Sequence, residues 1–132
     1  DMAWHDAKQP IDDAVALERQ ATEQVKIFDP IDDMIFSPTF SHIFAGGYAA
    51  GYYGYKWAEV LDADAFAKFK ENGIFDKKTA DEFRNNILTR GGTENPAKLY
   101  RQFRGQDPSV DALLIRDGIK EAPAIKAEIN KD

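Results

Sequence analysis

Apolar residues recur along this chain at spacings of three and four, and this period limits the fold more than any other feature. Such spacing places the apolar side chains on one face of an α-helix. A first helix is predicted over residues 11–28, and its apolar face consists of Ile11, Ala14, Leu17, Ala21, Val25 and Phe28. No stretch alternates convincingly with the period of two that is typical of a strand. The sequence therefore predicts an all-α fold.

Glycines and capping side chains mark the bounds of two further predicted helices. One ends near Asn72-Gly73, and its inward residues are Trp57, Val60, Leu61, Ala65 and Phe69. The next covers about 76–89, and its inward residues are Ala80, Phe83 and Ile87. Two starts are open for it, because Asp76 could cap it alone or Thr79 and Glu82 could form a capping box.

Two shorter helices are predicted after these. Asn95-Pro96 and Asp107-Pro108 each supply a capping side chain followed by proline at the first helical position. Gly105 and Gly118 stand where a left-handed C-terminal cap favours glycine. The residues expected to be buried are Leu99, Phe103, Val110, Leu113 and Leu114. Residues 121–132 are expected to form a polar tail with a short helix from Ala122 to Ile129.

Composition narrows the class of protein. The 132 residues suit one modest core, and the net charge of −6 argues against nucleic acid or an anionic membrane as a partner. There is no cysteine, which excludes disulfides and thiolate metal ligands, and the two histidines form no H-E-x-x-H zinc motif. The first residues do not resemble a signal peptide, and the longest uncharged run, Met34 to Tyr55, is too polar for a membrane span. We expect a cytoplasmic protein without a metal site in this chain.

Residues 46–55 do not fit an ordinary helical domain. They read Gly-Gly-Tyr-Ala-Ala-Gly-Tyr-Tyr-Gly-Tyr and hold four of the nine glycines and four of the five tyrosines. Glycine costs a helix interior about 1 kcal/mol relative to alanine, so a loop is favoured here. A mobile backbone that carries phenols suits an extended polar ligand such as a peptide. Neither a dinucleotide fingerprint nor a phosphate loop fits the spacing. The alternative is that the tyrosines pack in the core and the glycines permit close helix contacts.

A family resemblance extends from residue 1 to about residue 119. Residues 40–60, Phe-Ser-His-Ile-Phe-Ala-Gly-Gly-Tyr-Ala-Ala-Gly-Tyr-Tyr-Gly-Tyr-Lys-Trp-Ala-Glu-Val, closely resemble the C-terminal part of the thimet oligopeptidase family. The bacterial oligopeptidase A and peptidyl-dipeptidase branch is the most similar. Further matching stretches occur in the same order, and they are Asp1 to His5, Gly73 to Phe75, Arg90 to Gly92 and Phe103 to Leu114.

The resemblance implies a helical, two-lobed zinc metallopeptidase that hydrolyses short peptides in a channel between its lobes. In that family an H-E-x-x-H helix and a downstream glutamate hold the zinc, and all of these ligands precede the part seen here. The chain is then expected to be a C-terminal segment of a longer enzyme, which also agrees with its start at Asp1. Residues 1–120 would be that segment, with a substrate loop at 42–55. Its expected partners are short peptides and the missing N-terminal part. Alone, it is expected to be inactive.

Roles for individual residues follow from the resemblance. Tyr48 and Tyr55 are expected to donate hydrogen bonds near the scissile bond, where an oxyanion develops, and His42 to bind substrate or stabilise the transition state. Tyr52 is assigned to a neighbouring subsite. The hinges that let the loop close are expected to be Gly46, Gly47, Gly51 and Gly54.

Other polar and aromatic residues receive plainer interpretations. Tyr53 is expected to pack, and His5 to serve structure or surface. Asp32-Asp33 and Asp62-Ala63-Asp64 are interpreted as helix caps and solvated acids and not as metal ligands. We expect Arg101 and Arg104 to be surface or ion-pair residues.

Two other classes of function stay open. One is a stand-alone helical module that binds short peptides without metal. The other is a purely structural helical domain, in which replacing Tyr48 and Tyr55 by phenylalanine would change no function. For the isolated segment we expect no stoichiometric zinc, and self-association through apolar surface that the rest of an enzyme would cover.

Overall fold

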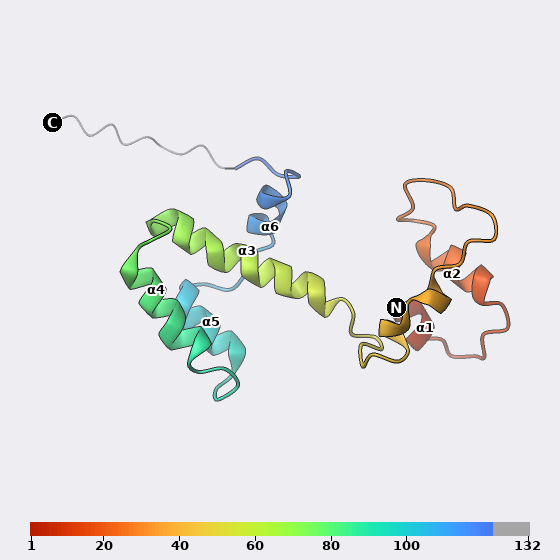
Figure 1. Ribbon diagram of the computed structural model, residues 1–132, viewed down its shortest axis with the longest axis horizontal. Coiled ribbons are helices and arrows are strands. Elements are labelled where there is room, and N and C mark those ends of the chain that lie inside the picture. Colours follow the sequence, from red (N-terminus) through yellow and green to blue (C-terminus); the bar gives the residue numbers. More distant parts are fainter. Residues whose placement is uncertain (123–132) are drawn as a thin grey trace. The chain divides into compact units, whose positions relative to one another are not determined.

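The computed structural model describes residues 1–122. These residues form helices and turns and contain no strand, which confirms the all-α prediction. The chain divides into two compact units at Tyr55 and Lys56. Figure 1 labels the α-helices of each unit.

The first unit contains two α-helices and two short 3₁₀ turns. They are α1 (Met2–His5), α2 (Ala14–Thr22), η1 (Ser37–Thr39) and η2 (Ser41–Ile43). The prediction of a helix over 11–28 was too long at both ends. Asp13 caps α2 by accepting a hydrogen bond from the backbone N–H of Ala16 at 2.9 Å. The downstream positions Val25 and Phe28 are 75% and 83% exposed.

Hydrogen bonds from the backbone to side chains hold segments of the first unit together. The two carboxylate oxygens of Glu18 accept hydrogen bonds from the backbone N–H groups of Phe36 and Ser37, at 2.8 and 2.7 Å. These bonds join α2 to the start of η1. Ser37 and Ile43 are the buried residues of the unit. Little apolar surface is therefore removed from water here, and hydrogen bonds from side chains to the backbone matter correspondingly more.

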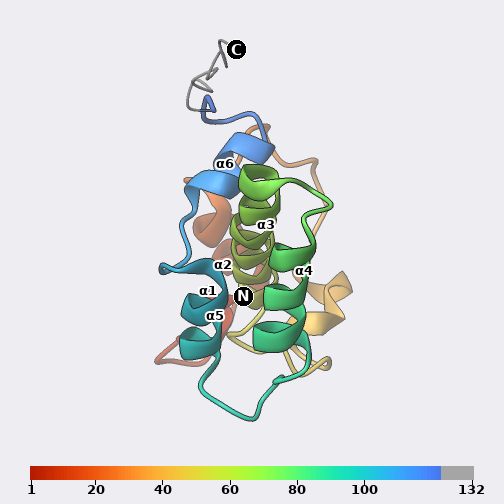
Figure 2. The same cartoon turned by 90° about the vertical axis from the view of Figure 1, so that its left-hand side faces the viewer.

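The second unit is a helical bundle around α3 (Gly54–Asn72), a helix whose first two residues belong to the first unit. The other helices are α4 (Lys77–Phe83), the π-helical turn η3 (Arg84–Leu88), α5 (Pro96–Arg104) and α6 (Asp111–Arg116). In Figure 2, α4 and α5 flank α3. Because η3 continues α4, the predicted helix over 76–89 is confirmed in extent.

The caps of α4 and α5 follow the sequence signals. The Asp76 carboxylate accepts a hydrogen bond from the Thr79 N–H at 2.7 Å, which settles the open start of α4 in favour of Asp76. Asn95 accepts hydrogen bonds from the N–H groups of the first turn of α5, and Gly105 ends that helix with a φ of 83°. Gly118 has a φ of 73°, as expected for a residue just beyond a helix.

The start of α6 was predicted too early. The helix begins at Asp111, with Val110 at the N-cap and no capping side chain. Asp107 does not cap it, because its carboxylate lies 2.6 Å from Nε of Arg101. The Asp107 carboxylate, which was expected to accept a hydrogen bond from the backbone of the helix, therefore pairs with Arg101 instead.

The core of the second unit lies between α3, α5 and α6. Buried apolar residues in this unit are Val60, Ala63, Leu99, Tyr100, Phe103 and Leu113. Phe103 is 0% exposed, and its ring meets those of Phe69 and Phe83 with centroids 6.2 and 5.1 Å apart. This confirms the predicted burial of Leu99, Phe103 and Leu113. The predictions for Trp57, Ala80 and Val110 were wrong, because all three are exposed.

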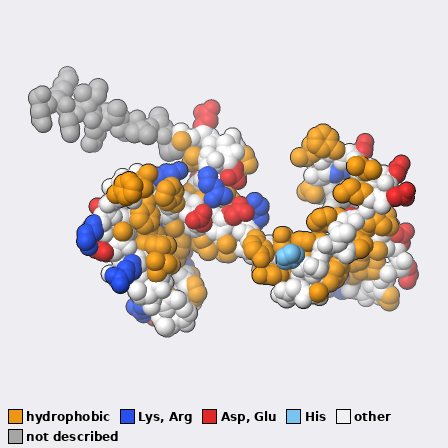
Figure 3. All heavy atoms as spheres, in the orientation of Figure 1, with side chains coloured by type: hydrophobic (Ala, Val, Ile, Leu, Met, Phe, Trp, Pro, Cys, Tyr) orange, Lys and Arg blue, Asp and Glu red, His pale blue; other side chains and the backbone are white. Residues whose placement is uncertain are grey.

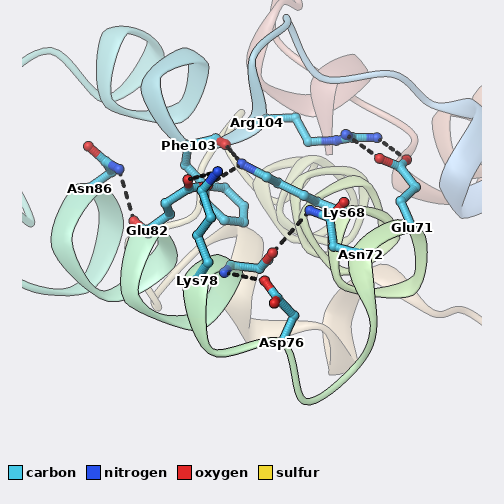
Figure 4. A network of polar contacts seen from close by, with 10 residues as sticks. Lys68, Glu71, Asn72, Asp76, Lys78, Glu82, Asn86, Phe103 and Arg104 are labelled. Carbon is cyan, nitrogen blue, oxygen red and sulfur yellow. Dashed lines mark hydrogen bonds and ion pairs between the residues drawn. The ribbon is translucent and has the colours of Figure 1, made fainter.

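A polar network joins α3, α4 and α5 (Figure 4). The ammonium of Lys68 pairs with Glu82 at 2.7 Å, donates a hydrogen bond to the backbone carbonyl of Phe103 and lies 4.7 Å from the centroid of that residue's ring. One side chain on α3 thus contacts both α4 and α5. Its side chain is 16% exposed, so these contacts are largely shielded from water.

Asp64 corrects the interpretation of Asp62-Ala63-Asp64 as caps and solvated acids. It lies inside α3, is 2% exposed and accepts a hydrogen bond from the Tyr100 hydroxyl at 2.6 Å. Burial and the Asp64 charge both raise the pKa of that phenol. Arg104 lies 3.3 Å from Asp64 and makes two hydrogen bonds with Glu71, which confirms its predicted place in ion pairs.

Two further predictions concern the ends and surface of the chain. The predicted helix from Ala122 to Ile129 falls almost wholly on residues 123–132, which lie outside the described residues. Within 1–122, no helix is long and apolar enough to cross a membrane. Both units carry exposed hydrophobic side chains, which colour much of the face seen in Figure 3.

Candidate functional site

Four of the residues singled out by the sequence lie together in the first unit. The ring centroids of His42 and Tyr48 are 6.0 Å apart, and those of Tyr48 and Tyr55 are 5.3 Å apart. Tyr52 is central, since its ring lies 5.9 Å from His42, 6.3 Å from Tyr48 and 5.1 Å from Tyr55. We call His42, Tyr48, Tyr52 and Tyr55 the aromatic cluster. Phe40, which precedes the cluster in the sequence, packs against it, with its ring centroid 4.6 Å from that of Tyr52.

The cluster combines contact among its rings with access to solvent. Tyr48 and Tyr55 are 37% and 47% exposed, and His42 is also exposed. The hydrogen-bonding interaction with Tyr48 raises the pKa of the Tyr55 phenol, and desolvation and the neighbouring phenols act in the same direction. The Tyr55 hydroxyl therefore keeps its proton, and its capacity to donate a hydrogen bond, throughout the neutral range.

Two of the four loop glycines have a structural reason to be glycine. A Cβ on Gly46 would lie 3.1 Å from Cα of His42, so this glycine permits close approach of the loop to His42. Gly47 has a φ of 77°, which disfavours any residue with a side chain. Gly51 and Gly54 have ordinary φ values, and an added Cβ meets no close neighbour at either position. The hinge role of all four stays a prediction.

The loop is anchored by His5 and by Asp1, and sequence reasoning missed Asp1. The carboxylate of Asp1 accepts hydrogen bonds from the backbone N–H groups of Ala50 and Tyr52, both at 2.9 Å. His5 Nε2 lies 2.7 Å from the carbonyl oxygen of Ile43 and 3.4 Å from the Asp1 carboxylate. The structural role expected of His5 is confirmed. No sequence signal marks Asp1, because its partners are backbone groups about 50 residues further along.

Tyr53 is separate from the cluster. It is 63% exposed, so the expectation that it packs was wrong for the described part of the chain. Tyr52, its neighbour in the sequence, lies inside the cluster. Tyr53 is therefore a natural control for experiments on the other three tyrosines.

The residues that the structure describes do not fit a bound metal ion. Among residues 1–122, no group of three or more His, Cys, Asp or Glu side chains is placed to hold one. Asp62 instead pairs with Arg116 at 3.2 Å, and Asp64 lies in the buried network already described. An apolar groove of about 510 Å³, lined by residues such as Trp57, Leu99 and Pro108, belongs to the second unit and contains none of the cluster.

The described residues are helical and carry a tyrosine-rich loop. Comparison with known families adds the class of protein, because the model of Peptidase family M3 matches residues 1–119. The chain belongs to this family.

Individual relatives carry peptidase names. Oligopeptidase A of Salmonella typhimurium is 59% identical over 85 residues, which are 64% of this chain and 12% of that protein. A probable cytosolic oligopeptidase A of Arabidopsis thaliana is 46% identical over 112 residues, or 82% of this chain and 16% of that protein. Dipeptidyl carboxypeptidase of Escherichia coli is 38% identical over 124 residues, or 90% of this chain and 18% of that protein. The chain thus spans less than a fifth of the length of these relatives.

Proposed function

We propose that this chain is the substrate-binding and transition-state-stabilising C-terminal segment of a zinc-dependent oligopeptidase that hydrolyses peptide bonds in short peptides. Membership of Peptidase family M3 supports peptide hydrolysis as the reaction. The names of the relatives support short peptides as substrates, and their greater length supports a longer polypeptide. That polypeptide would supply the other partner, an N-terminal part that holds the zinc.

The observation that carries the proposal is the convergence of three phenols and an imidazole on one partly exposed surface of the first unit. Peptide hydrolysis passes through a tetrahedral species with negative charge on the former carbonyl oxygen. A hydroxyl that donates to this oxygen lowers the barrier most when it is held in place beforehand. Tyr48 and Tyr55 fill this role in the proposal, while His42 contacts the same region of substrate and Tyr52 lines a neighbouring subsite.

Zinc belongs to the proposal only as a group held elsewhere. Residues 1–122 contain no set of side chains that fits it, so its ligands would lie in the N-terminal part. This chain would supply hydrogen-bond donors and loop closure. The segment alone would then have no peptidase activity.

Phenylalanine variants in the intact polypeptide test the roles of the tyrosines. Y48F and Y55F each remove one hydroxyl and keep the ring, so packing within the cluster is retained. We expect kcat on a short fluorogenic peptide to fall about 10²–10³-fold in each, the loss typical of one oxyanion donor. Y53F is the matched control and should stay within about twofold of the parent. Zinc content and melting temperature, measured on the same preparations, should not change.

The outcomes separate the alternative functions. If Y48F and Y55F behave like Y53F, the proposed roles are wrong and the tyrosines are structural. If the isolated 132-residue chain binds short peptides in a calorimetric titration without metal, and Y48F or Y55F weakens that binding, the stand-alone peptide-binding module is favoured. An equimolar zinc signal in the isolated chain after dialysis would contradict the placement of the zinc ligands elsewhere.

Location and self-association complete the proposal. A cytoplasmic location is supported by the printed name of one relative. Exposed apolar residues such as Ile27, Phe28 and Phe75 support self-association of the isolated segment, because that surface is unfavourable in water. Sedimentation velocity across a concentration series tests this, and a single monomeric species at every concentration would contradict it.

A further inference from the structure

We propose that Asp1 and His5 are positioning residues that hold the aromatic cluster in its working arrangement. The inference rests on the proposed function, because it assigns the two residues to the substrate site of that peptidase. It deepens that proposal by naming what fixes the loop. Neither residue would touch substrate, and both would act through the backbone of the segment that carries the tyrosines.

The carboxylate of Asp1 is committed to the loop. Asp1 stands at the N-cap position of α1, where an aspartate ordinarily accepts a hydrogen bond from its own helix, yet it makes no such bond. One of its oxygens accepts from the Ala50 N–H and the other from the Tyr52 N–H, both at 2.9 Å. Hydrogen bonds to an ionised carboxylate are among the stronger ones in proteins. The backbone on both sides of Gly51 is therefore fixed by a single side chain.

The loop conformation at this point requires an external contact. Ala50 has a φ of 52°, in the left-handed region that alanine rarely adopts. Such a conformation persists only where surrounding contacts hold it. The Asp1 carboxylate makes the contact at this residue and at Tyr52, the ring that touches every other member of the cluster. A shift of the Tyr52 backbone would thus be passed to His42, Tyr48 and Tyr55.

His5 fixes the opposite end of the same segment. Its Nε2 donates to the carbonyl oxygen of Ile43, the residue after His42, at 2.7 Å, and lies 3.4 Å from the Asp1 carboxylate. Ile43 is 2% exposed, so its carbonyl has little access to water as a replacement donor. The His5 ring also lies 5.9 Å from the ring of Phe44. Asp1 and His5 thus hold the backbone of the loop at two places. His5 binds it at Ile43, and Asp1 binds it at Ala50 and Tyr52.

Aspartate variants in the intact polypeptide test the inference. D1A removes both acceptors, whereas D1N replaces one of the two oxygens by an amide nitrogen that cannot accept. D6A is the control, because Asp6 ends the same helix and its carboxylate pairs only with Lys8 on the surface. We expect amide hydrogen exchange of peptides within residues 46–55 to accelerate about tenfold in D1N and more in D1A. D6A, and peptides from the second unit in every variant, should be unchanged.

Kinetics on the same variants give the second readout. We expect kcat to fall in the order parent, D1N, D1A, by about tenfold and about 10²-fold, because misplacing a reacting group by about 1 Å has an effect of that size. KM should change less than kcat, and zinc content should stay constant. A merely structural role would lower the melting temperature without this graded separation of kcat from KM.

The two readouts keep the inference and the proposed function distinguishable. Unchanged exchange in residues 46–55 of D1A would overturn the inference, whatever the activity. Faster exchange without any change in kcat would also overturn it as a statement about the peptidase site, while Y48F and Y55F would still test the site itself. H5L should reproduce the D1N effects, and H5Q, whose amide can donate to the Ile43 carbonyl, should restore most of the loss. Equal defects in H5L and H5Q would contradict the role given to His5.

Discussion

The two units of this chain are stabilised in different ways. In the second unit, helices bury a shared apolar core around Phe103, and their ends are fixed by local caps such as Asp76 and Asn95. In the first unit, Ile43 is the buried apolar residue among those described, and side chains bind backbone groups that are distant in sequence. The aromatic cluster lies in the unit with the smaller core. The loop that carries the cluster is held there by a few polar contacts, while the second unit has the more extensive packing.

The two tryptophans allow each unit to be followed separately. Trp4 belongs to the first unit and Trp57 to the second. A W57F background leaves fluorescence that reports on the first unit, and a W4F background leaves fluorescence that reports on the second. Unfolding measured in the two backgrounds therefore compares the stability of the two units.

The largest effect is expected for F103A in the second unit. Phe103 is 0% exposed, and truncating a buried phenylalanine typically costs about 3–5 kcal/mol. Urea unfolding in the W4F background should show this loss. F75A is the control, because Phe75 is 98% exposed, and its change should stay within about 0.5 kcal/mol. A comparable small change for F103A would mean that the second unit is not stabilised by its core.

An intermediate effect is expected for E18Q in the first unit. Glu18 accepts two backbone hydrogen bonds, and a neutral amide can accept only one, so we expect a loss of about 1–2 kcal/mol in the W57F background. E23Q is the control, since Glu23 makes an exposed pair with Lys26. If E18Q and E23Q unfold alike, the first unit does not depend on these polar contacts.

The same residue predicts a dependence on pH. Although burial opposes the effect, hydrogen bonds with Ser37 and Phe36 lower the pKa of the Glu18 carboxyl below its ordinary value of 4.5. A lowered pKa contributes stability that is present above the ordinary value and is lost as the pH falls through the folded-state value. The first unit should therefore lose stability below about pH 4.5 more steeply in the parent than in E18Q. Fluorescence-monitored unfolding from pH 3 to 7, at about 0.5-unit intervals, measures the difference.

The smallest effect is expected for two glycine variants in residues 46–55. G47A places a side chain at a φ of 77° and should cost about 1 kcal/mol. G54A lies at the first position of α3 with open space around it, so it should be neutral or slightly stabilising. Melting temperatures of the two variants give the comparison. Equal shifts would show that backbone conformation does not distinguish these glycines.

Helix caps and buried positions that depend on residues close together in the sequence could be predicted. The caps at Asn95 and Gly105 and the burial of Leu99 and Phe103 depend on local spacing, and the structure confirms them. The start of α6 could not be predicted, because the Asp107 carboxylate contacts Arg101 and not the backbone ahead of it. The end of α2 at Thr22 was also missed, since the apolar period of the sequence continues to Phe28 although Val25 and Phe28 are exposed.

The candidate site shows the same limit. Composition and resemblance pointed to His42 and the tyrosines, and the structure brings four of these side chains together. Their roles remain predictions. The role of the Asp1 carboxylate could not be predicted from the sequence. Its partners are backbone N–H groups, which nearly every residue type has, so the identity of the partner residue gives no signal.

Chemical modification of Lys68 can report whether the helices of the second unit are packed together. All three of Lys56, Lys68 and Lys77 pair with a carboxylate, but the side chain of Lys68 is 16% exposed, against 74% for Lys56 and 85% for Lys77. A reagent that acylates free amines should therefore modify Lys56 and Lys77 quickly and spare Lys68 for as long as α3, α4 and α5 stay packed. Since acylation also removes the positive charge, a single modification at Lys68 would mark a molecule that had opened and hinder its return. The yield of that adduct over time would measure how often the three helices separate.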